Sequence, residues 1–211
     1  MATSLPLRRY QYFAGIDPGM HGAIATMNAP GTSVRVFPMP VREGEIDLDE
    51  LRAIYRRLAL LPDLYLGIEW PQPWPGAFNN VIRDAECFGR QKGYLEAMAV
   101  CHRIDYGRIS PVMWKGRLGL DGKTIEGAND RAAKLFDTYY PEHRSLCHGP
   151  RGGLLDGPLD ALLIAHFLRT RTGSGMKSIA DRFGKDSVEA LAFILGGARR
   201  KRKFGKRKDS I

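Results

Sequence analysis

The first part of the chain alternates short apolar runs with glycine, proline and asparagine. Three such runs cover residues 12–16, 23–28 and 33–37, and their apolar and β-branched residues predict three strands. The separators are short, so we expect these strands to form an antiparallel meander. Two later runs, 64–69 and 103–109, have the same character and predict two further strands.

Elsewhere the apolar residues recur at the spacing of one face of a helix. This periodicity predicts helices over residues 47–61, 77–101, 123–140 and 155–169. Asp47 or Asp49 is a candidate cap for the first helix, and Pro62 and Pro141 follow the ends of the first and third. A short helix or turn is expected at 111–118, and the proline- and tryptophan-rich residues 70–76 predict a loop.

The order of these elements indicates the fold class. Three strands, a helix, a strand, a helix, a strand and then helices are typical of an α/β fold with a mixed five-stranded sheet flanked by helices. This is also the order of the ribonuclease H-like fold. We expect residues 1–170 to form that domain, and 171–211 to hold a linker, a short helix near 186–195 and a basic tail at 199–208.

The charge balance narrows the choice of partner. The 211 residues carry a formal net charge of +9 with 44% hydrophobic residues, which is the composition of a globular protein with a polyanionic partner. Nucleic acid is the commonest such partner. Charge alone leaves ribosomal, membrane-surface and nucleic-acid enzymes open.

Cysteine usage and hydropathy point to a cytoplasmic protein. Cys87, Cys101 and Cys147 show no paired spacing, which favours reduced thiols. No apolar run approaches the roughly 20 residues that cross a bilayer. The first strand is expected by about Tyr12, which leaves no room for a cleaved leader, so we expect no membrane partner.

Four carboxylates occupy the ends of predicted elements. Asp17 and Glu69 each end a predicted strand, and their side chains converge if the two strands are neighbours. Asp156 and Asp160 are four residues apart, which places both on one face of a helix. Like charges at this spacing repel each other, and a hard cation such as Mg²⁺ or Mn²⁺ would neutralise them.

Four such carboxylates can hold two divalent ions about 4 Å apart, an arrangement that hydrolyses phosphodiesters. Each residue also has a purely structural interpretation. Asp17 before Pro18-Gly19 suits a turn, Asp156 suits a helix cap, and Glu69 suits a charged strand end. Their joint placement at compatible element ends in a basic protein favours the metal site.

These residues carry a resemblance to the RuvC family of Holliday junction resolvases. The acidic motifs of that family are similar to Gly15-Ile16-Asp17-Pro18-Gly19, Ile68-Glu69 and Asp156-Gly157-Pro158-Leu159-Asp160. Its long central helix resembles Phe88-Gly89-Arg90-Gln91-Lys92-Gly93. The segment Ser110-Pro111-Val112-Met113-Trp114-Lys115, followed by Lys123 and Ala133-Lys134-Leu135-Phe136, looks closest to the phage and chloroplast branch.

The resemblance implies a role for each matched position. Asp17, Glu69, Asp156 and Asp160 match the metal-binding catalytic residues, and Lys115 and Lys123 fall where the family places cations facing the scissile phosphate. Trp74 and Phe78 match positions that present groups to the branch point of bound DNA. The family accepts His at the position of Asp156, and its bacterial members space the last two acidic groups by three residues, so the relative weights of Asp156 and Asp160 stay open.

Family resemblance implies paired, Mg²⁺-dependent nicking of four-way DNA by a homodimer packed through the long central helix. The apolar residues Phe88, Leu95 and Met98 of that helix are expected to serve both core and partner. Three alternatives stay open at this point. They are another ribonuclease H-like nuclease acting on flaps or RNA–DNA hybrids, a non-catalytic protein that binds branched DNA, and an actin-like or sugar-kinase ATPase, for whose two lobes the chain is too short.

Overall fold

The computed structural model describes residues 10–71, 81–120 and 127–172, all within the unit Met1–Ser174. Of residues 171–211, expected to hold the linker, short helix and basic tail, the structure describes only 171 and 172, which belong to the last helix; the proposed domain boundary stays a prediction. Within the described ranges, no helix is long and apolar enough to span a bilayer.

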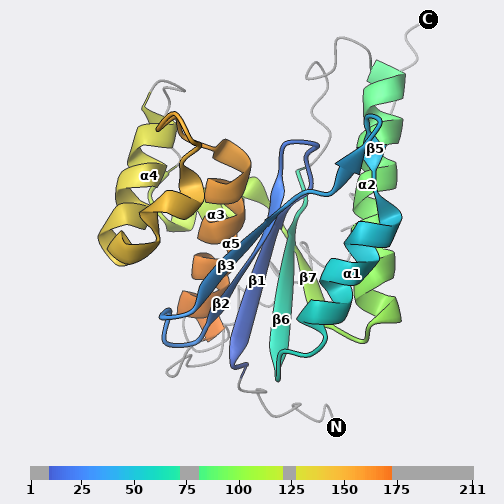
Figure 1. Cartoon of the computed structure of the whole chain (residues 1–211). Helices are drawn as coiled ribbons and strands as arrows, with labels where there is room; N and C mark the ends of the chain where they lie inside the picture. The colour runs from blue at the N-terminus through green and yellow to red at the C-terminus, as the bar shows by residue number, and fades with distance from the viewer. Residues whose placement is uncertain (1–9, 72–80, 121–126, 173–211) are drawn as a thin grey trace, which may run out of the picture. The chain divides into compact units, whose positions relative to one another are not determined.

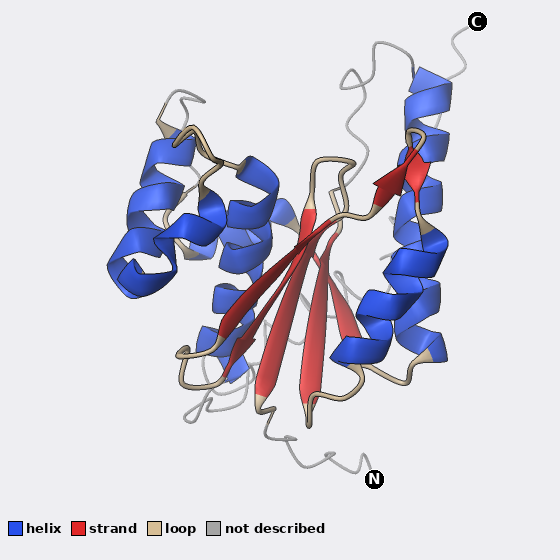
Figure 2. Cartoon of the chain, in the orientation of Figure 1, coloured by secondary structure: helices blue, strands red, loops and turns tan. Residues whose placement is uncertain are grey.

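A five-stranded mixed sheet forms the centre of the described domain (Figure 2). Its strands are β1 (Tyr12–Asp17), β2 (Ala23–Asn28), β3 (Val34–Pro38), β6 (Leu64–Glu69) and β7 (Asp105–Ile109), in the spatial order β3-β2-β1-β6-β7. The first three are antiparallel neighbours, whereas β6 pairs parallel to β1 and β7 parallel to β6. The predicted meander and mixed sheet are confirmed.

Helices cover both faces of this sheet (Figure 1). One face packs against α1 (Leu48–Leu58) and α2 (Val81–Cys101). The other packs against α3 (Pro111–Arg117), α4 (Ala128–Tyr139) and α5 (Asp156–Thr172). Successive side chains of β1 point to opposite faces of the sheet, so the strand contributes to two hydrophobic clusters. Phe13 packs on the α5 face, whereas Ala14 and Ile16 pack on the α1 face.

The first helix follows the sequence prediction at its start. The side chain of Asp47 accepts hydrogen bonds from the backbone N–H groups of Asp49 and Glu50, which identifies Asp47 as the cap. The helix ends at Leu58, three residues before the predicted end.

Several predicted boundaries are wrong for local reasons. The helix expected from Lys123 begins at Ala128, because Gly127 has a left-handed backbone with φ of 87°; residues 121–126 lie outside the described ranges. The last strand begins at Asp105 because Arg103 has φ of 56°. The predicted start of α2 at residue 77 stays a prediction, because it lies outside the described residues, which resume at Val81.

Two short elements were not predicted. A small hairpin joins β4 (Val41–Arg42) to β5 (Glu45–Ile46), and a 3-10 helix, η1 (Pro141–Cys147), follows α4. Both are too short to produce a periodic pattern of apolar residues.

Strand β1 and helix α5 pack in close backbone contact. A Cβ atom on Gly15 would collide with the carbonyl oxygen of Ala161 and lie 2.6 Å from the backbone nitrogen of Ala165. Gly67 is the partner of Gly15 on β6 and faces the same helix, where a Cβ would lie 2.7 Å from Leu168. The two glycines therefore let α5 lie directly on the sheet.

We expect Gly15→Ala to lower the free energy of unfolding by about 3 kcal/mol, because the added methyl meets backbone atoms that cannot move independently. Gly93→Ala is the matched control: Gly93 is an exposed residue inside α2, and its Cβ would meet no atom within 4 Å. This control should gain roughly 0.5–1 kcal/mol. Urea unfolding measures both, and equal stability of the Gly15→Ala protein and wild type would contradict the packing.

Candidate active site

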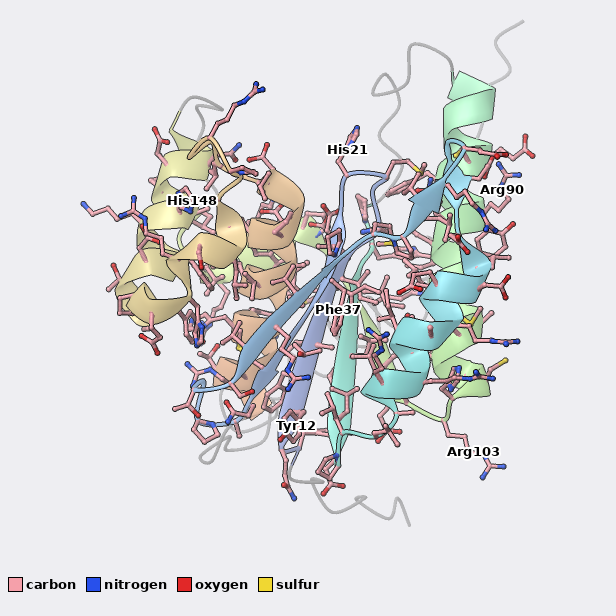
Figure 3. All side chains as sticks on the ribbon, viewed as in Figure 1. Tyr12, His21, Phe37, Arg90, Arg103 and His148 are labelled. Carbon is pink, nitrogen blue, oxygen red and sulfur yellow. The ribbon has the colours of Figure 1, made fainter. Side chains whose placement is uncertain are left out.

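Asp17 is the last residue of β1 and lies on the α5 face of the sheet. Phe13, Gly15 and Asp17 alternate onto the same face, so the carboxylate points toward the helix that carries Asp156 and Asp160. The backbone N–H of Gly19 donates to Asp17 Oδ1 at 3.3 Å. In Figure 3, His21 marks the turn at this end of β1, and Tyr12 marks the opposite end.

Glu69 ends the neighbouring parallel strand. The register pairs Gly15 with Gly67 and Ile16 with Ile68, so Asp17 and Glu69 are the next residues on two adjacent strands. Glu69 is only 8% exposed, and Trp114 Nε1 donates a hydrogen bond to its Oε1 at 2.9 Å. The two strands are neighbours, which is the condition under which the sequence analysis expects the two side chains to converge.

The start of α5 is held against the turn after β1. Gly157 is buried, and a Cβ there would collide with the carbonyl oxygen of His21 and lie 2.7 Å from Gly22 Cα. Backbone therefore touches backbone at this point. As a result Asp156 in the first turn of α5 and Asp160 in the second lie beside the end of β1.

Lys115 on α3 reaches the same group of acids. Its Nζ lies 3.0 Å from Asp160 Oδ2, with 39% of the lysine side chain and 24% of the aspartate side chain exposed. Burial raises the pKa values of Asp17 and Glu69, and the charge of this lysine opposes part of that rise. Lys115 is thus a member of the site that its sequence position predicted.

Burial and the charges of neighbouring acids shift the pKa values of Asp17, Glu69 and Asp160 upward. Burial raises the pKa of Asp17 to about 6, an effect offset in part by the Gly19 N–H and reinforced by the charges of Asp160 and Asp156. Burial also raises the pKa of Glu69 to about 7, with Trp114 opposing the shift and Asp17 adding to it. The pKa of Asp160 is raised by burial, while Lys115 opposes that shift. The four acids therefore act on one another electrostatically.

The carboxylates do not form a closed set of metal ligands. Among the residues that the structure describes, no three His, Cys, Asp or Glu side chains are close enough together to hold one ion. Each acid is instead bound by a donor: Trp114 binds Glu69, Lys115 binds Asp160, and Asn129 Nδ2 binds Asp156 Oδ1 at 2.9 Å. The four carboxylates still suit Mg²⁺ or Mn²⁺ as ligands, because these cations prefer oxygen ligands and would neutralise negative charges that repel one another.

Sequence reasoning missed Trp114 and Asn129 as members of the site. Trp114 offered a partial signal, because a buried indole N–H needs an acceptor, although the sequence does not identify which one. Asn129 offered none. Three other predicted residues, Trp74, Phe78 and Lys123, lie outside the described residues.

Comparison with known proteins rests on structure alone. No protein-family model matches the sequence, and neither does any curated protein. The fold matches Thermus thermophilus RuvC in complex with a Holliday junction substrate, with 15% identity and a TM-score of 0.50, over 83% of this chain and 97% of that one. The chain has the RuvC fold. The ribonuclease H-like fold expected from the sequence is thereby confirmed.

Two further solved structures resemble the chain less closely in shape. Another Thermus thermophilus RuvC structure has 18% identity and a TM-score of 0.48, covering 76% of this chain and 97% of that one. The yeast mitochondrial Holliday junction resolvase Ydc2 has 12% identity and a TM-score of 0.49, covering 80% and 81%. The expected similarity to the phage and chloroplast branch stays a prediction.

We expect Glu69→Gln to stabilise the metal-free protein at high pH. A raised folded-state pKa means that the folded chain holds a proton between pH 4.5 and 7 that the unfolded chain has lost, so stability falls as pH rises through this window. Glutamine removes that cost, which gives a gain of up to about 3 kcal/mol at pH 8 and almost none at pH 4.

Urea unfolding in the presence of a chelator measures this difference. The exposed Glu86→Gln on α2 is the control, and its stability at pH 8 should lie within about 0.5 kcal/mol of wild type. A Glu69→Gln protein less stable than wild type at pH 8 would show that Glu69 is not held at an electrostatic cost.

Proposed function

We propose that the chain is a metal-dependent endonuclease that resolves four-way (Holliday) DNA junctions by hydrolysing phosphodiester bonds. The observation that carries this proposal is the convergence of Asp17, Glu69 and Asp160, with Asp156 beside them, at the carboxyl ends of β1 and β6. The RuvC fold supports it, since one matching structure is a RuvC bound to a Holliday junction substrate.

The four carboxylates would bind Mg²⁺, and Mn²⁺ would substitute for it. When bound, such ions activate a water molecule and stabilise the leaving oxygen of a phosphodiester. The raised pKa values support this role, because buried acids that repel one another gain most from a divalent cation. Their ionised forms supply the ligand charge.

Lys115 contributes a positive charge from outside the group of acids. In the metal-free protein its ammonium binds Asp160. A cation at Asp160 would release this ammonium toward the scissile phosphate, where it would stabilise the charge that develops during hydrolysis. We propose the same use for Lys123, by resemblance to the family.

Paired cuts in two equivalent strands require two sites related by a two-fold axis, so we propose a homodimer. The resemblance suggests contact through α2. Leu95 is 1% exposed and packs into the core with Tyr55 and Leu66, so it serves its own chain. Phe88 and Met98 are half-buried and remain candidates for the partner surface.

The net charge of +9 supports DNA as the substrate. Trp74 and Phe78 are proposed to stack on unpaired bases at the branch point. The basic residues 199–208 are proposed to add contacts to phosphates that do not depend on sequence.

Cleavage of a synthetic four-way junction tests the function. With Mg²⁺ we expect symmetric nicks from wild type, and none after chelation. Amide variants of Asp17, Glu69, Asp156 and Asp160 should lose roughly 100-fold or more of the rate if their carboxylates hold the metal, since each removes several kcal/mol of charge stabilisation. Asp49→Asn, an exposed change on α1, should cut at the wild-type rate.

The substrate panel separates this proposal from its rivals. Flap and RNA–DNA hybrid substrates run in parallel should be cut more slowly than the junction. Preferential cutting of either one would assign the chain to a different ribonuclease H-like activity. Tight junction binding without any cutting, unchanged in Asp17→Asn, would make it a non-catalytic binder of branched DNA.

A further inference from the structure

A fully buried tryptophan donates its indole N–H to one of the site's carboxylates. Trp114 is 0% exposed and packs in the same core as Phe136 and Leu159, while its Nε1 lies 2.9 Å from Glu69 Oε1. A buried indole usually finds a partner for this group. Here the partner is an acid at the end of β6, 45 residues away along the chain.

The backbone fixes the distance between these two residues. Glu69 pairs with Ile109 in the β6–β7 register, and the N–H of Trp70 donates to the carbonyl of Ile109 at 2.7 Å. Helix α3 begins two residues later at Pro111, and the backbone N–H of Trp114 donates to the carbonyl oxygen of Ser110, the residue before the helix, at 3.2 Å. The indole is therefore carried on a helix that begins two residues after Ile109, the residue paired with Glu69.

We propose that Trp114 is the positioning residue of Glu69, an inference that rests on the proposed metal-dependent function. An indole has one N–H, so it can bind one carboxylate oxygen and leaves the other for a cation. It is also neutral, so it orients Glu69 without cancelling the charge that a cation needs. Partners of this kind orient metal ligands in many proteins.

The neighbouring residue on α3 provides the contrast. Lys115 binds Asp160 with a full positive charge, so it competes with any cation for that carboxylate. Trp114 and Lys115 are consecutive, and one short helix thus holds one acid with a neutral donor and another with a charged donor. Glu69 thus keeps its orientation when a cation binds, whereas Asp160 exchanges Lys115 for the cation.

The test is Trp114→Phe, which keeps most of the buried ring and removes the N–H. Mn²⁺ affinity, measured by calorimetry on the DNA-free protein, should weaken roughly 10- to 100-fold. Junction cleavage at saturating Mn²⁺ should recover most of its rate, and KM for the junction should be unchanged because Trp114 is buried away from DNA.

Phe136→Leu is the matched control. Phe136 is also 0% exposed in the same core, and its ring contact is with Tyr140. This variant should lose stability but keep the wild-type affinity for Mn²⁺. An equal loss of Mn²⁺ affinity in both variants, or no loss in Trp114→Phe, would overturn the positioning role of Trp114. The nuclease proposal would still stand if the wild-type protein cuts the junction. A wild type that neither binds Mn²⁺ nor cuts DNA would overturn both.

A second measurement covers the case in which Trp114→Phe does not fold. In wild type, the indole N–H resonance of Trp114, assigned by elimination with Trp70→Phe and Trp74→Phe, should shift as Mg²⁺ is added. Its midpoint should equal the Mg²⁺ dissociation constant measured by calorimetry. A resonance that stays fixed at saturating Mg²⁺ would overturn the proposal.

Discussion

The site depends on a backbone-to-backbone contact between α5 and the β1–β2 hairpin. Because Gly15 has no side chain, the middle of α5 can pack directly on the sheet. Because Gly157 has none, the first turn of α5 can contact the backbone of His21 and Gly22. Any side chain at either glycine would separate the two elements. Without that contact, Asp156 and Asp160 would not lie near Asp17, and the strand ends alone would offer two acids instead of four.

This arrangement has an electrostatic cost in the metal-free chain. Asp17, Glu69 and Asp160 are largely buried near one another, and burial raises the pKa of all three. Three donors offset part of this cost. The backbone N–H of Gly19 donates to Asp17, and Trp114 and Lys115, which are consecutive on α3, donate to Glu69 and Asp160. A region that binds a cation is often built in this way, with charges held in place before the ligand arrives.

Much of the fold could be predicted from the sequence. Apolar runs with clear boundaries located the five strands, and the cap at Asp47 was visible as an acid before a periodic segment. The convergence of Asp17 and Glu69 was expected only if their strands were neighbours, and the order of strands in the sheet became known from the structure. The ends of helices and strands were harder to predict than their existence. Gly127 before α4 and Arg103 before β7 adopt left-handed backbone conformations, which a periodic pattern of apolar residues does not reveal. The donors Trp114 and Asn129 could not be assigned, since their partners are brought close only by the tertiary fold.

The central claim is that the acids of β1, β6 and α5 together bind divalent cations. The most direct measurement is anomalous X-ray diffraction from crystals soaked in Mn²⁺. The account predicts an anomalous peak in contact with Asp17 and at least one of Glu69, Asp156 and Asp160, and its absence from Asp17→Asn crystals. Strong peaks elsewhere on the protein, with none beside Asp17 at saturating Mn²⁺, would contradict it.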